Sequence, residues 1–460
     1  MRKIFYFIFL INSITYSQKI RSEIDSIVSQ LVNSEMEYFE TDFEFNNVSK
    51  FNELKEKATT KELIQLSKSK NNQIKALALI ALVELKYKNL NQLLKKALND
   101  EHKIYIKEGC IVSQESFAYL LYDRVSNQHY YNKLDKEDLN YYNSKTKDFN
   151  HIIISNKNNY SLLGYALYNN NADVSNYSKI RKLAFNDQND VAILALAAYK
   201  NKKDIPKFIQ LREKAFEAIA VFNDESFWDF LLSYKNVEKS ENYFKAIASF
   251  QNEKSKNLLY EIINYKENDS IINKVFKSTS KYYSSLYLDL YKEIFQRKGY
   301  INTKIAKKLI ENNPIEASNI FSEKLLSKDP IYVYYEDYNA NELFEIYPLI
   351  LSIIKDNNYS KLENICINRI KLMDSFSMQA FLEIAEKEKF IDTSEVILER
   401  LKNKNTAFNY FHLSKTIFSF QNEKDIKIVL EILKHNEKDW NWGNWSDSFN
   451  ELFKSYNLNL

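Results

Sequence analysis

The chain has 460 residues, of which 45% are hydrophobic, so it is long enough to bury a large core. Its 64 basic and 61 acidic residues alternate along the sequence and give a formal charge of +3. This argues against nucleic-acid binding, because nucleic-acid-binding proteins concentrate Lys and Arg on one face. Only four Gly and four Pro are present, too few for folds that depend on tight turns, so the composition predicts an all-α fold.

Residues 1–17 are predicted to be a removable export signal. Arg2 and Lys3 form a basic start, and residues 4–11 are an unbroken apolar run. Thr15 and Ser17 supply the small residues expected just before a cleavage site. The apolar run is shorter than the roughly 20 residues of a membrane-spanning helix, and no later stretch is apolar enough to span a bilayer. We therefore expect an exported protein, periplasmic or extracellular; an uncleaved anchor is the alternative.

Helical periodicity begins directly after the predicted cleavage site. One apolar stripe predicts an N-terminal capping helix and consists of Ile20, Ile24, Ile27, Val28 and Leu31. Residues 63–98 then show a short helix, a polar turn at 70–72, and a second helix at 74–86 that is apolar on nearly every side. Such a helix must be covered on both sides, as it is inside a stack of helical hairpins.

The same pattern recurs along the chain. Residues 189–198 resemble residues 72–81, with Val191 aligned to Ile74, an offset of 117 positions. The motif F-x-A-I-A-x-F-x-x-E occurs at 216–225 and again at 244–253. The hexapeptide SFQNEK at 249–254 recurs unchanged at 419–424. We interpret these self-matches as repeated packing positions that are followed by a turn, without a ligand.

Residues 63–98 resemble a HEAT repeat, and residues 180–209 are similar to a more diverged one. Together with the predicted signal, they resemble exported bacterial HEAT-repeat proteins of unassigned activity. The repeat spacing differs from the family pattern in drifting between 28 and 39 residues. The resemblance implies an α-α superhelix, that is, a HEAT- or armadillo-like solenoid of stacked helical hairpins. It also implies that this solenoid serves as a binding surface, and it transfers no catalytic residues.

Three stretches interrupt the periodicity, at 129–159, 266–283 and 329–348. The second is the predicted boundary between two parts of the mature chain. Residues 18–265 are then an N-terminal HEAT-like solenoid, and residues 266–460 are a C-terminal helical-repeat half.

No catalytic, cofactor or metal motif stands out. The five histidines are dispersed, and no cysteine lies at metal-ligand spacing. His102, Glu108 and Cys110 could form a nucleophile with its base, but the apolar pair after Cys110 favours a buried thiol. Cys366 is 256 positions away, so two separate thiols are favoured over a disulfide. We therefore predict a protein that is not an enzyme and has no cofactor or metal site.

Two aromatic groups are candidate binding residues, because Trp and Tyr rings stack on sugars and anchor protein interfaces. One precedes the last predicted helix and consists of Trp440, Trp442 and Trp445. The other lies in the third interruption and consists of Tyr332, Tyr334, Tyr335 and Tyr338. The tryptophans could instead close the end of the helical stack.

The sequence as a whole predicts an exported, non-enzymatic helical-repeat scaffold that binds a protein partner. A carbohydrate-binding module is the first alternative, and the tryptophans would be its site. The second is a polysaccharide-active enzyme with a helical toroid, which four glycines make hard to build, since catalytic loops need glycine turns.

Overall fold

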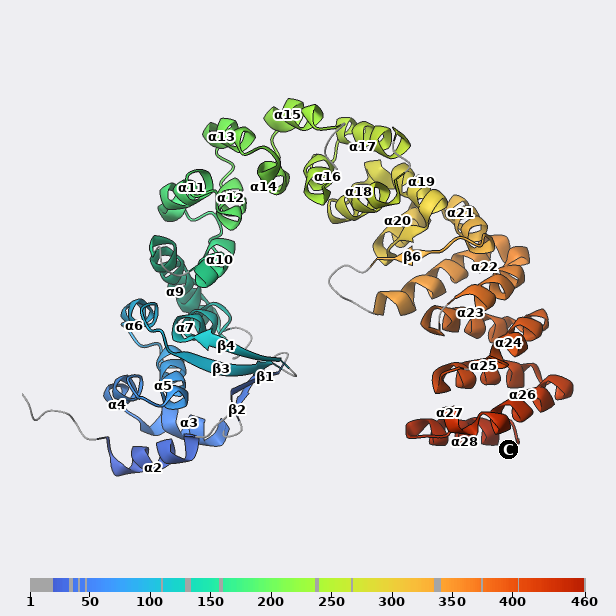
Figure 1. Ribbon diagram of the computed structural model, residues 1–460, viewed down its shortest axis with the longest axis horizontal. Coiled ribbons are helices and arrows are strands. Elements are labelled where there is room, and N and C mark those ends of the chain that lie inside the picture. The colour runs from blue at the N-terminus through green and yellow to red at the C-terminus, as the bar shows by residue number, and fades with distance from the viewer. Residues whose placement is uncertain are drawn as a thin grey trace, which may run out of the picture. The chain divides into compact units, whose positions relative to one another are not determined.

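The computed structural model describes most of the chain after the predicted export signal, which lies outside the described residues. The described residues are 20–32, 36–39, 42–45, 48–108, 111–128, 134–156, 160–235, 240–265, 268–334, 341–373, 375–403 and 405–458. Within these ranges the structure has 26 α-helices and six short strands (Figure 1). The prediction of an all-α fold is confirmed. None of the described helices is long and apolar enough to cross a membrane.

The chain divides into two compact units, Met1–Ala218 and Ile219–Leu460. The boundary that we predicted at residue 266 stays a prediction. The helices of the first unit are α2 (Ser22–Leu31), α3 (Val48–Lys57), α4 (Thr60–Leu66), α5 (Asn72–Glu84), α6 (Leu90–Ala97), α7 (Phe117–Ser126), α9 (Lys136–Ser155), α10 (Tyr160–Tyr168), α11 (Tyr177–Phe185), α12 (Asp190–Ala197) and α13 (Ile205–Gln210). Helix α14 (Phe216–Phe222) crosses the boundary between the units.

Helix α5 shows how an all-apolar helix is accommodated. The side chain of Asn71 caps it by accepting a hydrogen bond from the backbone N–H of Ile74 at 3.0 Å. Every residue from 76 to 83 is buried, because α4, α7 and strand β3 (Lys103–Glu108) pack around the helix. Helix α12 begins with an equivalent cap, Asn189. The two capping residues, Asn71 and Asn189, are 118 positions apart, one more than the offset of 117 in the sequence alignment.

The first unit also contains a four-stranded sheet, which the all-helical sequence pattern does not predict. Its order is β2–β1–β3–β4, with β1 (Met36–Phe39), β2 (Asp42–Phe45) and β4 (Ile111–Ser116). The pairs β1–β2 and β3–β4 are antiparallel, and β1 pairs with β3 in parallel. In β3, the buried Ile104 and Ile106 alternate with Tyr105, which is 62% exposed. This period of two is that of a strand with one face against the helices.

The second unit is built of helices that alternate between two rows (Figure 1). One row contains α16 (Glu241–Ala248), α18 (Asp269–Lys281), α20 (Thr303–Asn312), α23 (Ser375–Glu388) and α25 (Ala407–Phe420). The other contains α17 (Glu253–Tyr265), α19 (Leu288–Lys298), α21 (Pro314–Leu326), α24 (Ser394–Leu401) and α26 (Glu423–His435). Helix α22 (Asn341–Leu372) is kinked at Asn358 and contacts both rows. The remaining helices are α15 (Trp228–Ser233), α27 (Glu437–Trp440) and α28 (Asn444–Ser455).

One turn recurs between successive helices. A residue in the left-handed region ends one helix, and an Asn or Asp directly after it caps the next helical segment. The pairs are Lys200–Asn201, Asn223–Asp224, Gln251–Asn252 and Gln421–Asn422. Both copies of SFQNEK contain this turn, so the repeated hexapeptide encodes a helix end followed by a helix start.

Candidate functional site

The predicted residues Tyr332 and Tyr334 are held by a short parallel pairing. Strand β6 (Tyr332–Val333) lies beside β5 (Tyr300–Ile301), which directly follows α19. The backbone N–H of Tyr332 donates to the carbonyl oxygen of Gly299 at 2.9 Å, and that of Tyr334 donates to Ile301 at 2.8 Å. Gly299 has φ +73°, and a Cβ there would lie 2.4 Å from a backbone oxygen of the segment before β6. Only glycine therefore fits where the two segments meet.

The pairing gathers three tyrosines, Tyr300, Tyr332 and Tyr334, which we call the tyrosine platform. The ring centroid of Tyr300 lies 5.2 Å from that of Tyr332 and 5.6 Å from that of Tyr334. Phe276, buried in α18, supports Tyr334 at 5.4 Å. Tyr300 is buried, Tyr334 is half-buried, and Tyr332 is 48% exposed. The platform therefore has a packed base and one open ring.

The phenols of Tyr300 and Tyr334 stay protonated at neutral pH. Burial, together with the nearby Tyr300, raises the pKa of Tyr334 to about 12. Burial also raises the pKa of Tyr300. A protonated phenol can both donate and accept a hydrogen bond, so the platform offers an apolar ring surface with neutral polar groups at its edge.

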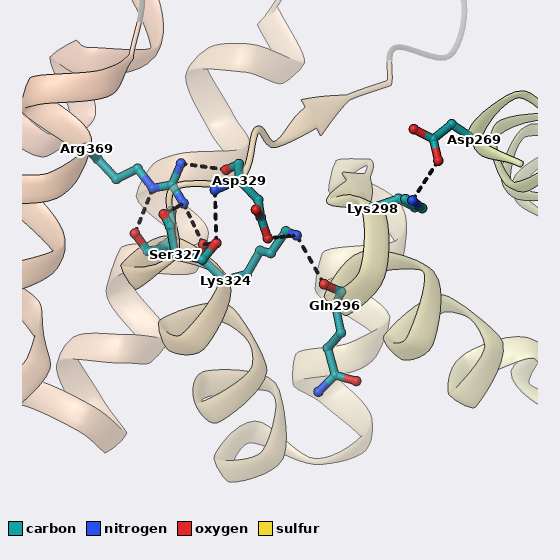
Figure 2. Close-up of polar contacts among 8 residues, drawn as sticks. Asp269, Gln296, Lys298, Lys324, Ser327, Asp329 and Arg369 are labelled. Atoms are coloured by element: carbon teal, nitrogen blue, oxygen red, sulfur yellow. Dashed lines mark hydrogen bonds and ion pairs between the residues drawn. The ribbon is translucent and has the colours of Figure 1, made fainter. Parts of the chain in front are cut away.

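Arg369, from the C-terminal half of α22, fixes the segment that leads into β6 (Figure 2). Its side chain is 2% exposed, and its guanidinium donates hydrogen bonds to four backbone carbonyls. Nε donates to Leu325 at 2.8 Å, and Nη1 donates to Asp329 at 3.2 Å. Nη2 donates to Ser327 at 2.8 Å and also to Lys324. Helix α21 ends at Leu326, and its last carbonyls have no partners within the helix; that of Lys324 also accepts a hydrogen bond from the Ser327 hydroxyl at 2.9 Å.

Burial lowers the pKa of Arg369, and the neighbouring Tyr347 and Asp329 partly oppose this effect. The guanidinium nevertheless stays charged, because arginine is not deprotonated inside proteins. A charged donor near the carbonyl end of a helix also interacts favourably with the helix dipole.

A second buried cation joins α21 to α19. Lys324 has a side chain that is 3% exposed, and its Nζ donates to the carbonyl of Gln296 at 3.1 Å. The same Nζ forms an ion pair with Asp329 at 3.0 Å, which lowers the pKa of that carboxyl group. Nearby, Lys298 pairs with Asp269 at 2.6 Å (Figure 2). These contacts hold the turn after α21 against the end of α19, so β6 is presented from a rigid base.

The three predicted tryptophans do not form one exposed surface. Trp440 is 3% exposed; its Nε1 donates to the carbonyl of Leu433 at 2.8 Å, and its ring lies 4.3 Å from Phe449. Trp445 is half-buried and packs against α25. Trp442 alone is exposed, at 57%. Trp440 and Trp445 thus belong to the core of the last helices, and one indole is left for a ligand.

The remaining sequence candidates are placed as follows. Tyr335, Tyr338 and Cys110 lie outside the described residues. His102 is exposed, and its Nδ1 lies 2.8 Å from a carboxylate oxygen of Asp100. Among the described side chains, no group of three His, Cys, Asp or Glu is placed to hold a metal ion.

Sequence patterns do not identify the residues that make the platform a unit. Phe276 and Tyr300 belong to other elements, and Arg369 follows the tyrosines by more than 30 positions. The one local signal is the run from Gly299 to Ile301, where a glycine after a helix precedes two residues that favour strands.

No family model, no curated protein and no solved structure matches this chain. The resemblance to HEAT repeats therefore stays a prediction.

Proposed function

We propose that this chain is an exported, non-enzymatic helical-repeat scaffold of the HEAT or armadillo-like kind, and that it binds a protein partner through the tyrosine platform. The two rows of helices in the second unit and the recurring helix-ending turn support the repeat class. The observation that carries the binding role is Tyr332, which is 48% exposed on a strand whose flanks are fixed by β5 and by Arg369.

A rigidly mounted tyrosine suits a protein interface for two reasons. Its ring supplies a large apolar contact area while only two side-chain torsions have to be ordered, so little conformational entropy is lost on binding. The backbone around Tyr332 is already ordered by its hydrogen bond to Gly299, so binding need not order it again. Such preorganised aromatic residues are typical of the positions that dominate binding energy.

The proposal is tested by photo-crosslinking in the native cell envelope. A benzophenone amino acid replaces Tyr332 in one version of the chain and Tyr168 in another, because Tyr168 is 81% exposed and lies in the other unit. We expect one protein to be captured in near-stoichiometric amount from position 332 and not from position 168. Without the crosslinker, Tyr332→Ser should lower co-purification of that protein by about ten-fold, and Tyr168→Ser should not. Equal capture from both positions, or none from position 332, contradicts the proposal.

Export is tested separately by sequencing the N-terminus of the envelope protein. A mature chain that begins at Gln18 supports a cleaved signal, whereas a chain that retains residues 4–11 indicates an anchor.

Glycan binding is the second candidate function, and the exposed indole of Trp442 is the observation that favours it. A glycan array screened with the full chain and with Trp442→Ala tests this candidate. Binding that is lost in the variant, at an unchanged melting temperature, would move the function from proteins to sugars.

A further inference from the structure

We call Lys277, Lys281 and Lys304 the lysine row, of which Lys277 lies over Tyr334 of the tyrosine platform. Lys277 and Lys281 are one helical turn apart on α18, and Lys304 is in the first turn of α20. All three are exposed, and none forms an ion pair with any described residue. Each Nζ instead lies over a tyrosine ring. The distances to the ring centroids are 5.1 Å for Lys277 and Tyr334, 6.0 Å for Lys281 and Tyr282, and 5.5 Å for Lys304 and Tyr283.

Three described carboxylates near Tyr334, Tyr300 and Tyr283 pair with other cations. Glu241, close to Tyr334, pairs with Lys245 at 2.7 Å. Asp269, close to Tyr300, pairs with Lys298 at 2.6 Å. Glu311, close to Tyr283, pairs with Lys308 at 2.6 Å. Among the described residues, the lysine row is therefore a net positive surface; Glu336 and Asp337, which follow Tyr334 in the sequence, lie outside the described residues.

The same geometry distinguishes between kinds of anionic partner. A sugar ring or a nucleic-acid base binds a tyrosine by stacking on an open ring face. In the lysine row the rings of Tyr282, Tyr283 and Tyr334 each have an ammonium group over them. What remains available is the ammonium groups themselves, and among protein side chains their partners are the carboxylates of Asp and Glu.

We propose that the lysine row and the exposed ring of Tyr332 together bind an acidic segment of the protein partner, whose Asp and Glu carboxylates accept hydrogen bonds from the three ammonium groups. This inference rests on the proposed function and adds the chemistry of the partner. The exposed Tyr332 supplies apolar contact, and the lysines supply long-range attraction and orientation.

The experiment measures binding of a short fluorescein-labelled oligoglutamate peptide to the full chain by fluorescence anisotropy. The comparison ligands are oligoglutamine of equal length, a uronate oligosaccharide and a short DNA duplex. The test variant carries Lys277→Gln, Lys281→Gln and Lys304→Gln. The matched control removes the same charge from three exposed lysines of the same unit that also lack ion pairs with described residues, by Lys427→Gln, Lys434→Gln and Lys438→Gln.

We expect the oligoglutamate to bind, the oligoglutamine not to bind, and affinity to fall as salt is added. The test variant should weaken binding by about ten-fold, because three exposed charge contacts are lost, and the control by less than about two-fold. Equal weakening in both variants, tighter binding of the uronate or the DNA, or no binding of oligoglutamate overturns the proposal.

The crosslinking at position 332 separates this inference from the function on which it rests. If the test variant still captures the partner in full amount, the partner does not use the lysine row, while the proposed function stands. If the wild-type chain captures nothing, the proposed function itself fails.

Discussion

Replacing Arg369 with Met should release the tyrosine platform from its support. Methionine has about the length of the arginine stem and can fill the apolar part of the site, but it donates no hydrogen bond. The four carbonyls at and after the end of α21 would lose the guanidinium, although that of Lys324 would keep its bond from the Ser327 hydroxyl at 2.9 Å. The hydrogen bonds to the carbonyls of Lys324 and Leu325 are buried. The hydrogen bonds to the carbonyls of Ser327 and Asp329 are only partly buried, so water can take the place of the guanidinium there.

The expected cost follows from the two buried bonds. A hydrogen bond to a charged group contributes about 1.5–3 kcal/mol, and removing Arg369 also removes the unfavourable burial of its charge. We therefore expect Arg369→Met to lower the free energy of unfolding of the second unit by about 3 kcal/mol. For a unit of this size, that is a fall in melting temperature of about 6–12 °C.

Hydrogen exchange locates the effect. The amides of Tyr332 and Tyr334, which donate to β5, should exchange faster in Arg369→Met. The matched control is Arg400→Met, because Arg400 donates to the carbonyls at the end of α22 in the same way. The control should destabilise the protein without speeding exchange in β6. Unchanged protection of β6 in Arg369→Met, or equal loss in both variants, would refute the idea that this arginine supports the platform.

Three other changes test separate parts of the structure. Gly299→Ala should cost about 2 kcal/mol or more and speed exchange in β6, because the residue has φ +73° and its Cβ would lie 2.4 Å from a backbone oxygen. In thermal denaturation, Trp445→Ala should lose about 2 kcal/mol, because its half-buried ring is packed, whereas Trp442→Ala should change stability by less than about 0.5 kcal/mol. The hydrogen bond from Arg21 lowers the pKa of Glu62 from 4.5 to about 2. Glu62 therefore stabilises the fold fully above pH 4.5 and loses this effect as the pH falls toward 2. Urea denaturation should show the stability gap between wild type and Glu62→Gln closing over that window, and a constant gap would contradict the assignment.

The helical class was predictable because it depends on composition and on local periodicity. Four glycines exclude most folds that rely on tight turns, and the apolar residues between 74 and 83 follow the helical period. The caps were equally local, since Asn71 and Asn189 each stand directly before a helix. These signals need only neighbouring residues, so the sequence contains them in full.

The four-stranded sheet was missed because its pairing is long-range. Residues 103–108 alternate apolar and polar over too short a stretch to outweigh the helical composition around them. The apolar pair Ile111 and Val112 favours a buried Cys110 thiol in the sequence, but Val112 is 61% exposed on β4. In a strand, successive residues point to opposite faces, so two adjacent apolar residues do not imply that both are buried.

The support of the candidate site was missed for the same reason. The sequence identified Tyr332 and Tyr334, because aromatic residues in an interruption of the helical period are candidates for an exposed binding surface. It could not identify Arg369, whose bonds to the turn after α21 span about 40 positions. An arginine in a helix usually faces water, and only the folded structure shows that this one is 2% exposed.

The left-handed turns explain how a chain with four glycines ends so many helices. Asn223 and Gln251 both have φ +50°, and their side chains donate to the carbonyls of Ser249 and Tyr283, near the end of a following helix, at 2.8 and 3.0 Å. Glycine at such a position would relieve about 1 kcal/mol of backbone strain but would lose a hydrogen bond of similar worth. Gln251→Gly should therefore change the free energy of unfolding by less than about 0.5 kcal/mol.

Gln421 has φ +56°, and its side chain makes no hydrogen bond with any described residue, so Gln421→Gly should stabilise the fold by about 0.5–1 kcal/mol. Chemical denaturation of the two variants measures this difference. Equal stabilisation would show that the side-chain bond at Gln251 contributes nothing, and that the scarcity of glycine has another cause.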